Sequence, residues 1–306
     1  MKNILFYKYV DIEDSEQLKE EQFNLSKSLN LLGTILVANE GINGCLSGNE
    51  KDLEEYKKIL MKNKRFSDIK FKEGPANKHT FKRLHVRVRD EIVSSNFDIN
   101  VKNAAPYIEP KQLKQLLDNN GGIILLDSRN KYEVNIGKFK NAIHLDLDTF
   151  KQFSLKINQL KNNNKDDNNK KIHNNKNEIN KKLLKNKKII LYCTGGVRCE
   201  KASAFLIENG FNNVFQLHGG ILSYGNECGN THWEGKCFVF DTRGAVDIDP
   251  NSQSEPITQC VLCNLPNADL HNCALTTCDK FFTACEDCFK VLKECCSKRC
   301  RGEINI

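Results

Sequence analysis

The stretch Leu191–Arg198 has the composition of an anion-binding loop built around a reactive cysteine. An apolar run ends at Cys193, two glycines follow, and a helix is expected to begin near Arg198. Backbone N–H groups at a helix start and an adjacent guanidinium both stabilise negative charge, so the thiol pKa should fall. We predict that Cys193 is the catalytic nucleophile. The residues expected to form its anion cradle are Thr194, Gly195, Gly196, Val197 and Arg198.

The two cysteines of this loop also have other interpretations. An isolated cysteine at a strand end is often a buried structural residue, but a glycine pair, an arginine and a helix start coincide at Cys193, which favours catalysis. Cys199 follows Arg198 directly and is a candidate resolving thiol for a persulfide or sulfenate on Cys193. It could equally be a small residue packed in the first helical turn, and both interpretations stay open.

A second group of sulfur ligands lies near the C-terminus, where nine of the 14 cysteines fall between Cys260 and Cys300. Two Cys-x-x-Cys pairs there are typical of a zinc ribbon, in which four thiolates surround the metal. The predicted ligands are Cys260, Cys263, Cys285 and Cys288. A second site could be formed by Cys273, Cys278, Cys296 and Cys300. All-cysteine sites are usually closed, so we expect structural zinc; free thiols would leave this segment without a core.

A row of cationic residues marks a candidate RNA-binding surface. In the stretch 83–89, apolar residues alternate with charged ones, so the charged residues should share one face of a strand. These residues are Arg83, His85, Arg87 and Arg89. Neighbouring like charges repel unless they are neutralised, and phosphates of an RNA backbone would neutralise them. The alternative is a solvated face that pairs with carboxylates of neighbouring strands.

The elements that must position these groups fall into three segments, which predicts an α/β protein of three domains. Residues 1–99 follow a β-α-β-β-α-β order, typical of a ferredoxin-like α+β domain whose last strand is expected within Phe81–Val93. Residues 100–225 alternate helices with buried apolar strands, which indicates a mostly parallel sheet with helices on both faces. Residues 226–306 have little periodicity and are expected to form the zinc-stabilised module.

Residues 156–188 interrupt the central domain. This stretch is rich in asparagine and lysine and lacks aromatic residues, so we expect a disordered surface insertion. Its eleven lysines and three acidic residues carry more positive charge than the net +7 of the whole chain. Bulk charge is therefore poor evidence for nucleic-acid binding. The alternative is a basic arm that contacts RNA.

Composition also limits the cellular setting. No apolar run reaches the length of about 18 residues that a membrane-spanning helix needs. The first residues read as a strand and not as a signal peptide. Clustered cysteines without such a peptide indicate metal ligation in a reducing compartment, so we expect a cytoplasmic protein that does not bind a membrane.

The central segment resembles the rhodanese superfamily. The similarity rests on the Cys193–Arg198 loop, on the upstream Asp-x-Arg, Glu and Ala-Ile-His pattern, and on His218–Ile221. It implies that Asp127, Arg129 and Glu133 brace the sheet and loop through ion pairs. Cysteine-dependent phosphatases have one more residue between cysteine and arginine, and the smaller cradle here suits a persulfide better than a tetrahedral phosphate. Phosphatase or arsenate reductase activity is therefore the weaker interpretation.

Nearly the whole chain, apart from the 156–188 insertion, resembles the oxygen-dependent tRNA uridine(34) hydroxylases. The quoted parts are Asn39–Gly44, Leu84–Val93, Cys193–Ala202 and Trp233–Asp241, followed by the cysteine-rich tail. The resemblance implies hydroxylation of the wobble uridine at carbon 5, with molecular oxygen as co-substrate, giving 5-hydroxyuridine as the first step towards 5-oxyacetyl-type uridines. It implies tRNA, through its anticodon loop, as the partner, and not DNA.

The residues themselves do not show how oxygen would be activated. We find neither a nucleotide-cofactor motif of the Rossmann type nor a histidine–carboxylate triad suited to non-haem iron. A covalent adduct or a persulfide on Cys193 is our hypothesis. Two other functions remain open at this point: a rhodanese-type sulfurtransferase that uses a Cys193 persulfide, and a non-enzymatic zinc-stabilised RNA-binding protein.

Overall fold

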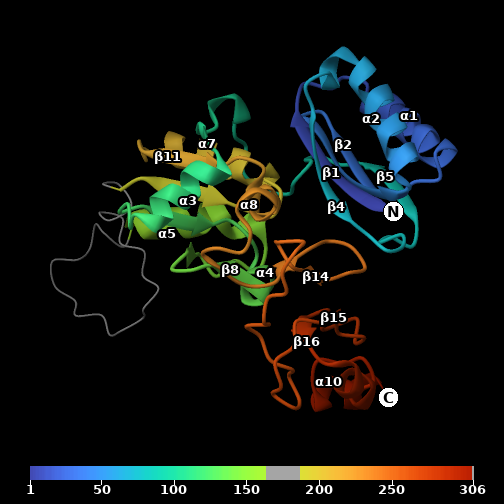
Figure 1. Cartoon of the computed structure of the whole chain (residues 1–306), viewed down its shortest axis with the longest axis vertical. Helices are drawn as coiled ribbons and strands as arrows, with labels where there is room; N and C mark the ends of the chain where they lie inside the picture. The colour runs from blue at the N-terminus through green and yellow to red at the C-terminus, as the bar shows by residue number, and fades with distance from the viewer. Residues whose placement is uncertain (163–186, 305–306) are drawn as a thin grey trace.

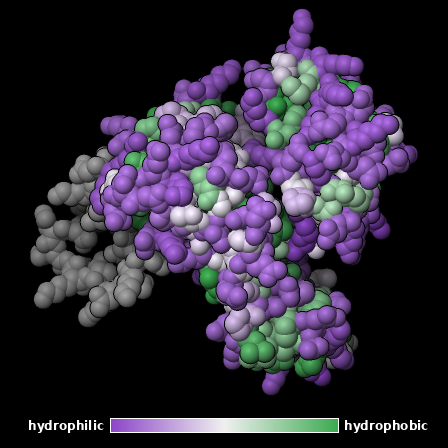
Figure 2. All heavy atoms as spheres, viewed as in Figure 1, coloured by the Kyte–Doolittle hydropathy of each residue, from purple (hydrophilic) through white to green (hydrophobic). Residues whose placement is uncertain are grey.

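The computed structural model describes residues 1–162 and 187–304. An N-terminal unit packs beside a central domain, and a small cysteine-rich module extends from the central domain (Figure 1). Most of the visible surface is hydrophilic, with apolar residues gathered on the cysteine-rich module (Figure 2). No helix among the described residues is long and apolar enough to cross a membrane.

The N-terminal unit is a five-stranded sheet with two helices on one face (Figure 1). Its elements are β1 (Lys2–Tyr9), α1 (Ser15–Ser28), β2 (Leu32–Ala38), β3 (Gly41–Gly48), α2 (Glu50–Lys62), the 3-10 turn Lys64–Phe66, β4 (Lys70–Pro75) and β5 (Leu84–Val88). The strand order is β4-β1-β3-β2-β5. All pairings are antiparallel except β2 with β5, which is parallel. This confirms the predicted ferredoxin-like order.

The prediction of the last strand of that unit was wrong in one respect. The strand that completes it is β4, which pairs with β1 at one edge, whereas the arginine-rich β5 is added beyond β2 at the opposite edge. β4 was missed because its sequence, Lys-Phe-Lys-Glu-Gly-Pro, has almost no apolar alternation. Phe71 anchors it, with its ring centroid 5.4 Å from that of Phe6.

The two faces of the N-terminal sheet serve different purposes. Along β1, Ile4 and Phe6 are fully buried in the core beneath the helices. Leu5 and Tyr7 alternate with them and therefore point to the opposite face. That second face, which carries no helix of its own, lies against the central domain.

The central domain is built on a parallel five-stranded sheet, as predicted. The strand order is β6 (Tyr107–Ile108), β11 (Val214–Leu217), β10 (Ile189–Tyr192), β7 (Ile124–Asp127) and β9 (Ile143–His144). Helices α5 (Phe153–Asn162) and α7 (Val197–Glu208) bury one face, and α3 (Pro110–Asp118) and α8 (Gly220–Cys228) bury the other. Both layers exclude water, which explains why the strands read as continuous apolar runs.

Shorter elements connect and extend this domain. They are the 3-10 turns Val101–Asn103 and Phe150–Gln152, α4 (Lys131–Ile136), β8 (Gly137–Phe139), β12 (Trp233–Gly235), β13 (Cys237–Phe238) and β14 (Ala245–Val246). β12 pairs with β8 in a separate two-stranded sheet, so the chain contacts the central domain again before it enters the last module. That module contains β15 (Leu270–Asn272), β16 (Phe281–Thr283), α9 (Glu286–Val291) and α10 (Lys298–Ile304).

The first part of the predicted insertion is helical. Helix α5 continues to Asn162, and Ile157 is fully buried in the central core. The first part of the stretch 156–188 is therefore helical, because its few apolar residues find a partner surface that composition alone does not reveal. Residues 163–186 of the insertion lie outside the described residues.

Candidate functional site

The Cys193–Arg198 loop, which carries the candidate nucleophile and is named the reactive loop, connects β10 to α7, as the sequence pattern indicated. Cys193 follows the last residue of β10 and is buried, and α7 begins at Val197. Gly196 has a φ of 102°, in the left-handed region that favours glycine. Its N–H donates to the Cys193 Sγ over 3.1 Å. The chain therefore turns back over its own sulfur and directs a backbone donor at it.

Opposing electrostatic effects act on the Cys193 thiol. Burial raises its pKa, but a hydrogen bond from the Cys199 thiol, the Arg198 charge, and the N–H groups of Arg198 and Gly196 together lower it to about 5. Burial and the neighbouring Cys193 thiolate hold the pKa of Cys199 well above its usual range. The pair thus consists of a thiolate at Cys193 and a thiol at Cys199 near neutral pH.

Two buried ion pairs lie near the loop, and one of them holds it in place. Arg198 donates two hydrogen bonds to the Glu133 carboxylate, at 2.6 and 2.7 Å, and both side chains are nearly inaccessible. Arg129 donates to Asp127 and to the carbonyl of Gly137, each over 2.7 Å. Since the Arg198 guanidinium is committed to Glu133, it acts on the sulfur through its charge and its backbone N–H. The Arg198–Glu133 pair joins the loop to α4, and the Arg129–Asp127 pair joins the end of β7 to β8.

The N-terminal sheet closes over the reactive loop. A Cβ added at Gly195 would lie 2.5 Å from the Leu5 side chain, and one at Gly196 would lie 2.9 Å from the Tyr7 hydroxyl. Tyr7 also donates a hydrogen bond of 2.9 Å to Glu200 on α7. The two glycines therefore permit the loop geometry and also the close approach of β1.

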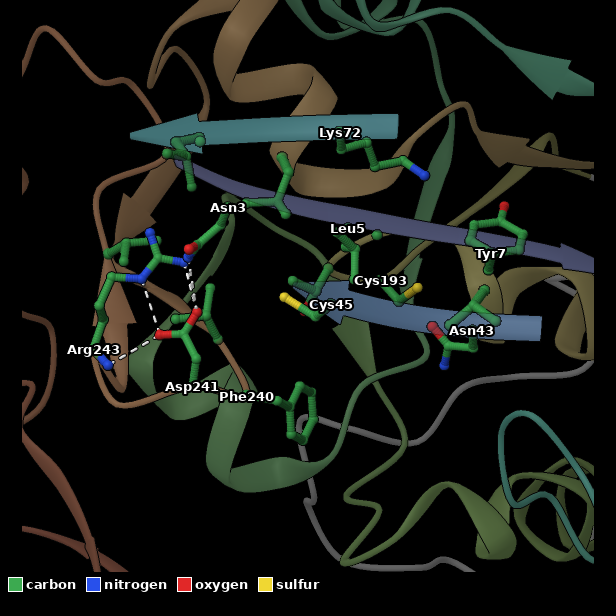
Figure 3. Close-up of a pocket in the computed structure, with 18 of the residues that line it drawn as sticks. Asn3, Leu5, Tyr7, Asn43, Cys45, Lys72, Cys193, Phe240, Asp241 and Arg243 are labelled. Atoms are coloured by element: carbon green, nitrogen blue, oxygen red, sulfur yellow. Dashed lines mark hydrogen bonds and ion pairs between the residues drawn. The ribbon is translucent and has the colours of Figure 1, made fainter. Parts of the chain in front are cut away.

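A cavity of about 1080 Å³ lies between the uncovered sheet face, the reactive loop and the segment that follows β13 (Figure 3). Polar, apolar and charged side chains from all three parts line it. Those that matter most are Asn3, Leu5, Tyr7, Asn43, Cys45, Lys72, Cys193, Phe240, Asp241 and Arg243. Because the cavity lies between domains, no single segment of the sequence could have indicated it.

Lys72 is a cavity residue that the sequence analysis missed, because its strand β4 was not recognised. Its Nζ lies 4.7 Å from the centre of the Tyr7 ring and has no hydrogen bond or ion pair among the described residues. Burial lowers the pKa of Lys72 to about 8, although the negative charges of Cys193 and Glu200 oppose this change. Lys72 thus brings an unpaired cation from the N-terminal sheet to the cavity that contains the thiolate.

The cationic row extends the same sheet face. β5 pairs with β2 so that His85 stands beside Thr34 and Arg87 beside Leu36, and both β2 residues line the cavity. The three arginines are exposed, and His85 is half-buried. No carboxylate pairs with any of the four among the described residues. Ion pairs with carboxylates of neighbouring strands, the alternative considered above, are thus not found for this row in the described part of the chain.

The cysteine-rich module brings both predicted quartets together. Each set places its four sulfurs within 4.8 Å of one another and could hold a metal ion. Neighbouring sulfurs lie 3.9 Å apart between Cys263 and Cys285, and 3.7 Å apart between Cys278 and Cys296. A tetrahedron with Zn–S bonds of about 2.3 Å has edges of about 3.8 Å, so both donor sets fit zinc. Cys295 belongs to neither set.

Comparison with known proteins assigns the three parts of the chain. Residues 1–92 match the family described as "UPF0176 acylphosphatase like domain". Residues 109–227 match the family "Rhodanese-like domain", and residues 234–301 match the family "Rhodanase C-terminal". A Cytophaga hutchinsonii protein named tRNA uridine(34) hydroxylase is 36% identical over 300 residues, covering 97% of this chain and 89% of that protein. A Chlamydia felis protein of the same name is 35% identical, covering 97% and 86%.

Among solved structures, the rhodanese-like domain of an Anabaena protein covers 42% of this chain and 79% of that chain, with 20% sequence identity and a TM-score of 0.29. An overlap this loose adds nothing to the assignment. The assignment rests on the two relatives that match along 97% of this chain.

Proposed function

Because the chain belongs to the family of tRNA uridine(34) hydroxylases, we propose that it hydroxylates the wobble uridine of tRNA at carbon 5, with Cys193 as the reactive group and molecular oxygen as co-substrate. The observation that carries this proposal is the thiolate of Cys193 at the wall of a cavity large enough for a nucleotide. Under this proposal the chain is an enzyme and not a purely passive RNA-binding protein.

A thiolate in this position can activate uracil by addition. In the proposed step the Cys193 sulfur forms a bond to carbon 6, the C5=C6 π bond breaks, and its electrons move through carbon 5 to the O4 oxygen. The resulting enolate makes carbon 5 electron-rich, which is the property that attachment of oxygen at this carbon requires. One atom of O2 then joins carbon 5 as a hydroxyl group and the other leaves as water, with two electrons and two protons supplied overall by an external reductant. Later loss of the carbon 5 proton and departure of the thiolate restore the ring.

Lys72 is suited to assist this addition. A cation near the developing enolate stabilises its charge, and the effect is largest where water is excluded. Arg198 is paired with Glu133 and Arg243 with Asp241, whereas Lys72 has no such partner among the described residues. We therefore assign Lys72 the role of the cation that accepts the negative charge of the substrate.

We propose that tRNA phosphates lie along Arg83, His85, Arg87 and Arg89, that the protein acts in the cytoplasm, and that the two quartets hold structural zinc. The Arg87→Ala variant should weaken binding of the anticodon stem-loop. The slope of the logarithm of the binding constant against the logarithm of the salt concentration should become shallower by about 1. Lys58→Ala, an exposed lysine on the helical face of the same sheet, is the matched control and should leave the slope unchanged. An unchanged slope in Arg87→Ala would remove this surface from the proposal.

The decisive experiment replaces Cys193. Hydroxylation by molecular oxygen needs two further electrons from a donor, so tRNA nucleosides are best measured in cells that lack any other route to 5-hydroxyuridine. Cys193→Ser should abolish 5-hydroxyuridine and its derivatives, a loss on the order of 10³-fold or more. Cys228→Ser, a half-buried cysteine outside the cavity, should preserve them. Normal levels in Cys193→Ser would refute the assignment of the nucleophile.

A sulfurtransferase is the second candidate, because the same cradle would stabilise a Cys193 persulfide. It predicts cyanide-dependent release of thiocyanate from thiosulfate by the purified protein. Rapid turnover in this assay, combined with unchanged tRNA nucleosides in the cell experiment, would favour sulfur transfer over hydroxylation.

A further inference from the structure

Phe240 lines the cavity, and packing within the fold does not explain why this large apolar residue is exposed. Its side chain is 62% exposed, and it is the large apolar residue left exposed among those described around the cavity. Isolated exposed apolar residues are common on surfaces. This one, however, lines the cavity that Cys45 and Cys193 also line (Figure 3). Its place at the cavity calls for a partner that is not part of the fold.

The ring is supported from behind. Phe238, which is nearly buried, packs edge-on against it with centroids 4.9 Å apart. The guanidinium carbon of Arg198 lies 5.9 Å from the ring centre, and the ion pair with Glu133 fixes that guanidinium. A ring held in this way needs little reorganisation to accept a flat partner, so its binding surface is already formed. Arg198 also links Phe240 directly to the loop that carries the reactive sulfur.

The volume of the cavity indicates that it can hold more than one nucleobase. Pockets for drug-sized ligands have volumes of about 300–1000 Å³, and this cavity of about 1080 Å³ exceeds that range. A uracil placed against Cys193 would therefore leave room at the Phe240 end. Enzymes that act on RNA bases commonly unstack neighbouring bases and receive them on aromatic side chains, because every base has a π face.

We propose that Phe240 is a stacking platform for a nucleobase adjacent to the target uridine. The inference rests on the proposed function, since it takes the anticodon loop of tRNA as the substrate. Phe240 thereby positions the substrate and takes no part in bond making. The cationic row on β5 lies on the same sheet face and would carry the connecting phosphates.

The test measures stacking without turnover. Anticodon stem-loop RNAs carry 2-aminopurine in place of the nucleotide immediately before or after the target uridine, and their fluorescence is followed during titration with the full-length protein. Stacking on an aromatic ring quenches this fluorescence. The variants are Phe240→Leu, which keeps apolar volume but has no ring, and Phe240→Trp, which keeps a ring. Leu265→Ala, an exposed apolar residue outside the cavity, is the control.

The native protein and Phe240→Trp should quench one of the two labels. Phe240→Leu should lose that quenching and bind roughly 5- to 150-fold more weakly, the range of base–aromatic stacking in alanine substitutions. Leu265→Ala should behave as the native protein does. If neither label is quenched, or if Phe240→Leu quenches as the native protein does, the proposal is wrong. Quenching together with an absence of 5-hydroxyuridine in cells would instead refute the proposed function and leave the platform intact.

Discussion

The reactive loop and the cysteine-rich module use the same side chain for opposite purposes. In the loop, one sulfur is surrounded by N–H donors and a guanidinium and lies at the wall of an open cavity. In the module, sulfurs gather in fours, so that each could share a cation with three others. A thiolate that opens on a cavity can react, whereas four thiolates around one metal are closed to substrate.

A third cysteine shows that the surroundings, and not proximity to the cavity, decide reactivity. Cys45 lines the same cavity as Cys193. Burial raises the pKa of Cys45 to about 12, and no N–H group of the described residues donates to its sulfur to reverse that effect. Cys45 is therefore a neutral thiol at physiological pH. The difference between the two cysteines follows from the loop that begins α7.

The largest expected effect is the loss of zinc from the cysteine-rich module, which should leave the reactive loop unchanged. Cys285→Ser removes one ligand of the first quartet, and structural zinc contributes about 10–16 kcal/mol of apparent binding free energy in zinc-finger peptides. The module should lose bound zinc and become sensitive to protease, while alkylation of Cys193 stays fast. Zinc content, limited proteolysis and iodoacetamide kinetics test this. Cys295→Ser replaces a buried cysteine of the same module that belongs to neither quartet, and it should retain the zinc. Full zinc content in Cys285→Ser would contradict the quartet.

The next effect concerns pH. The Cys193 pKa is depressed to about 5 from an ordinary value of 9.0, so its thiolate stabilises the folded state fully above about pH 9, and this stabilisation declines as the pH falls and is lost below about 5. Alkylation of Cys193 should be half-maximal near pH 5. Hydroxylation should also decline above about pH 8, where Lys72 loses its proton.

Lys72→Arg keeps its charge to higher pH and should extend activity upward, whereas Lys72→Met should lower activity at every pH. A Lys72→Arg profile that declines at the same pH as the native enzyme would exclude Lys72 as the titrating group. Alkylation that follows an ordinary thiol pKa near 9 would remove the distinction between Cys193 and the other cysteines.

The smallest expected effect tests the support of the loop. Glu133→Gln leaves Arg198 buried without a carboxylate, and breaking a buried ion pair in this way costs about 3–5 kcal/mol. Denaturant unfolding should show this loss in the central domain. Glu286→Gln breaks an exposed pair with Lys290 in the cysteine-rich module and should leave stability unchanged. Equal midpoints for Glu133→Gln and the native protein would show that the pair does not hold the loop.

Local sequence patterns determined those parts of the protein whose residues are neighbours along the chain. The Cys193–Arg198 cradle spans one strand end and one helix start, so its geometry follows from backbone rules within a few residues. The Cys-x-x-Cys pairs are also made of residues that are close along the chain. The continuous apolar runs of the parallel strands indicate by themselves that both faces of the sheet are buried. These features could be predicted because each depends on short-range order.

Tertiary structure alone decided what faces the sulfur. Lys72, Leu5 and Phe240 reach the cavity from a weakly patterned edge strand, a central strand and a connecting segment. No periodicity encodes their distance to Cys193, because that distance is set by how the uncovered face of one sheet packs on the loop of another domain. The sequence by itself therefore determined the loop that cradles the Cys193 sulfur, and the docking of the two domains determined the cavity onto which this sulfur opens.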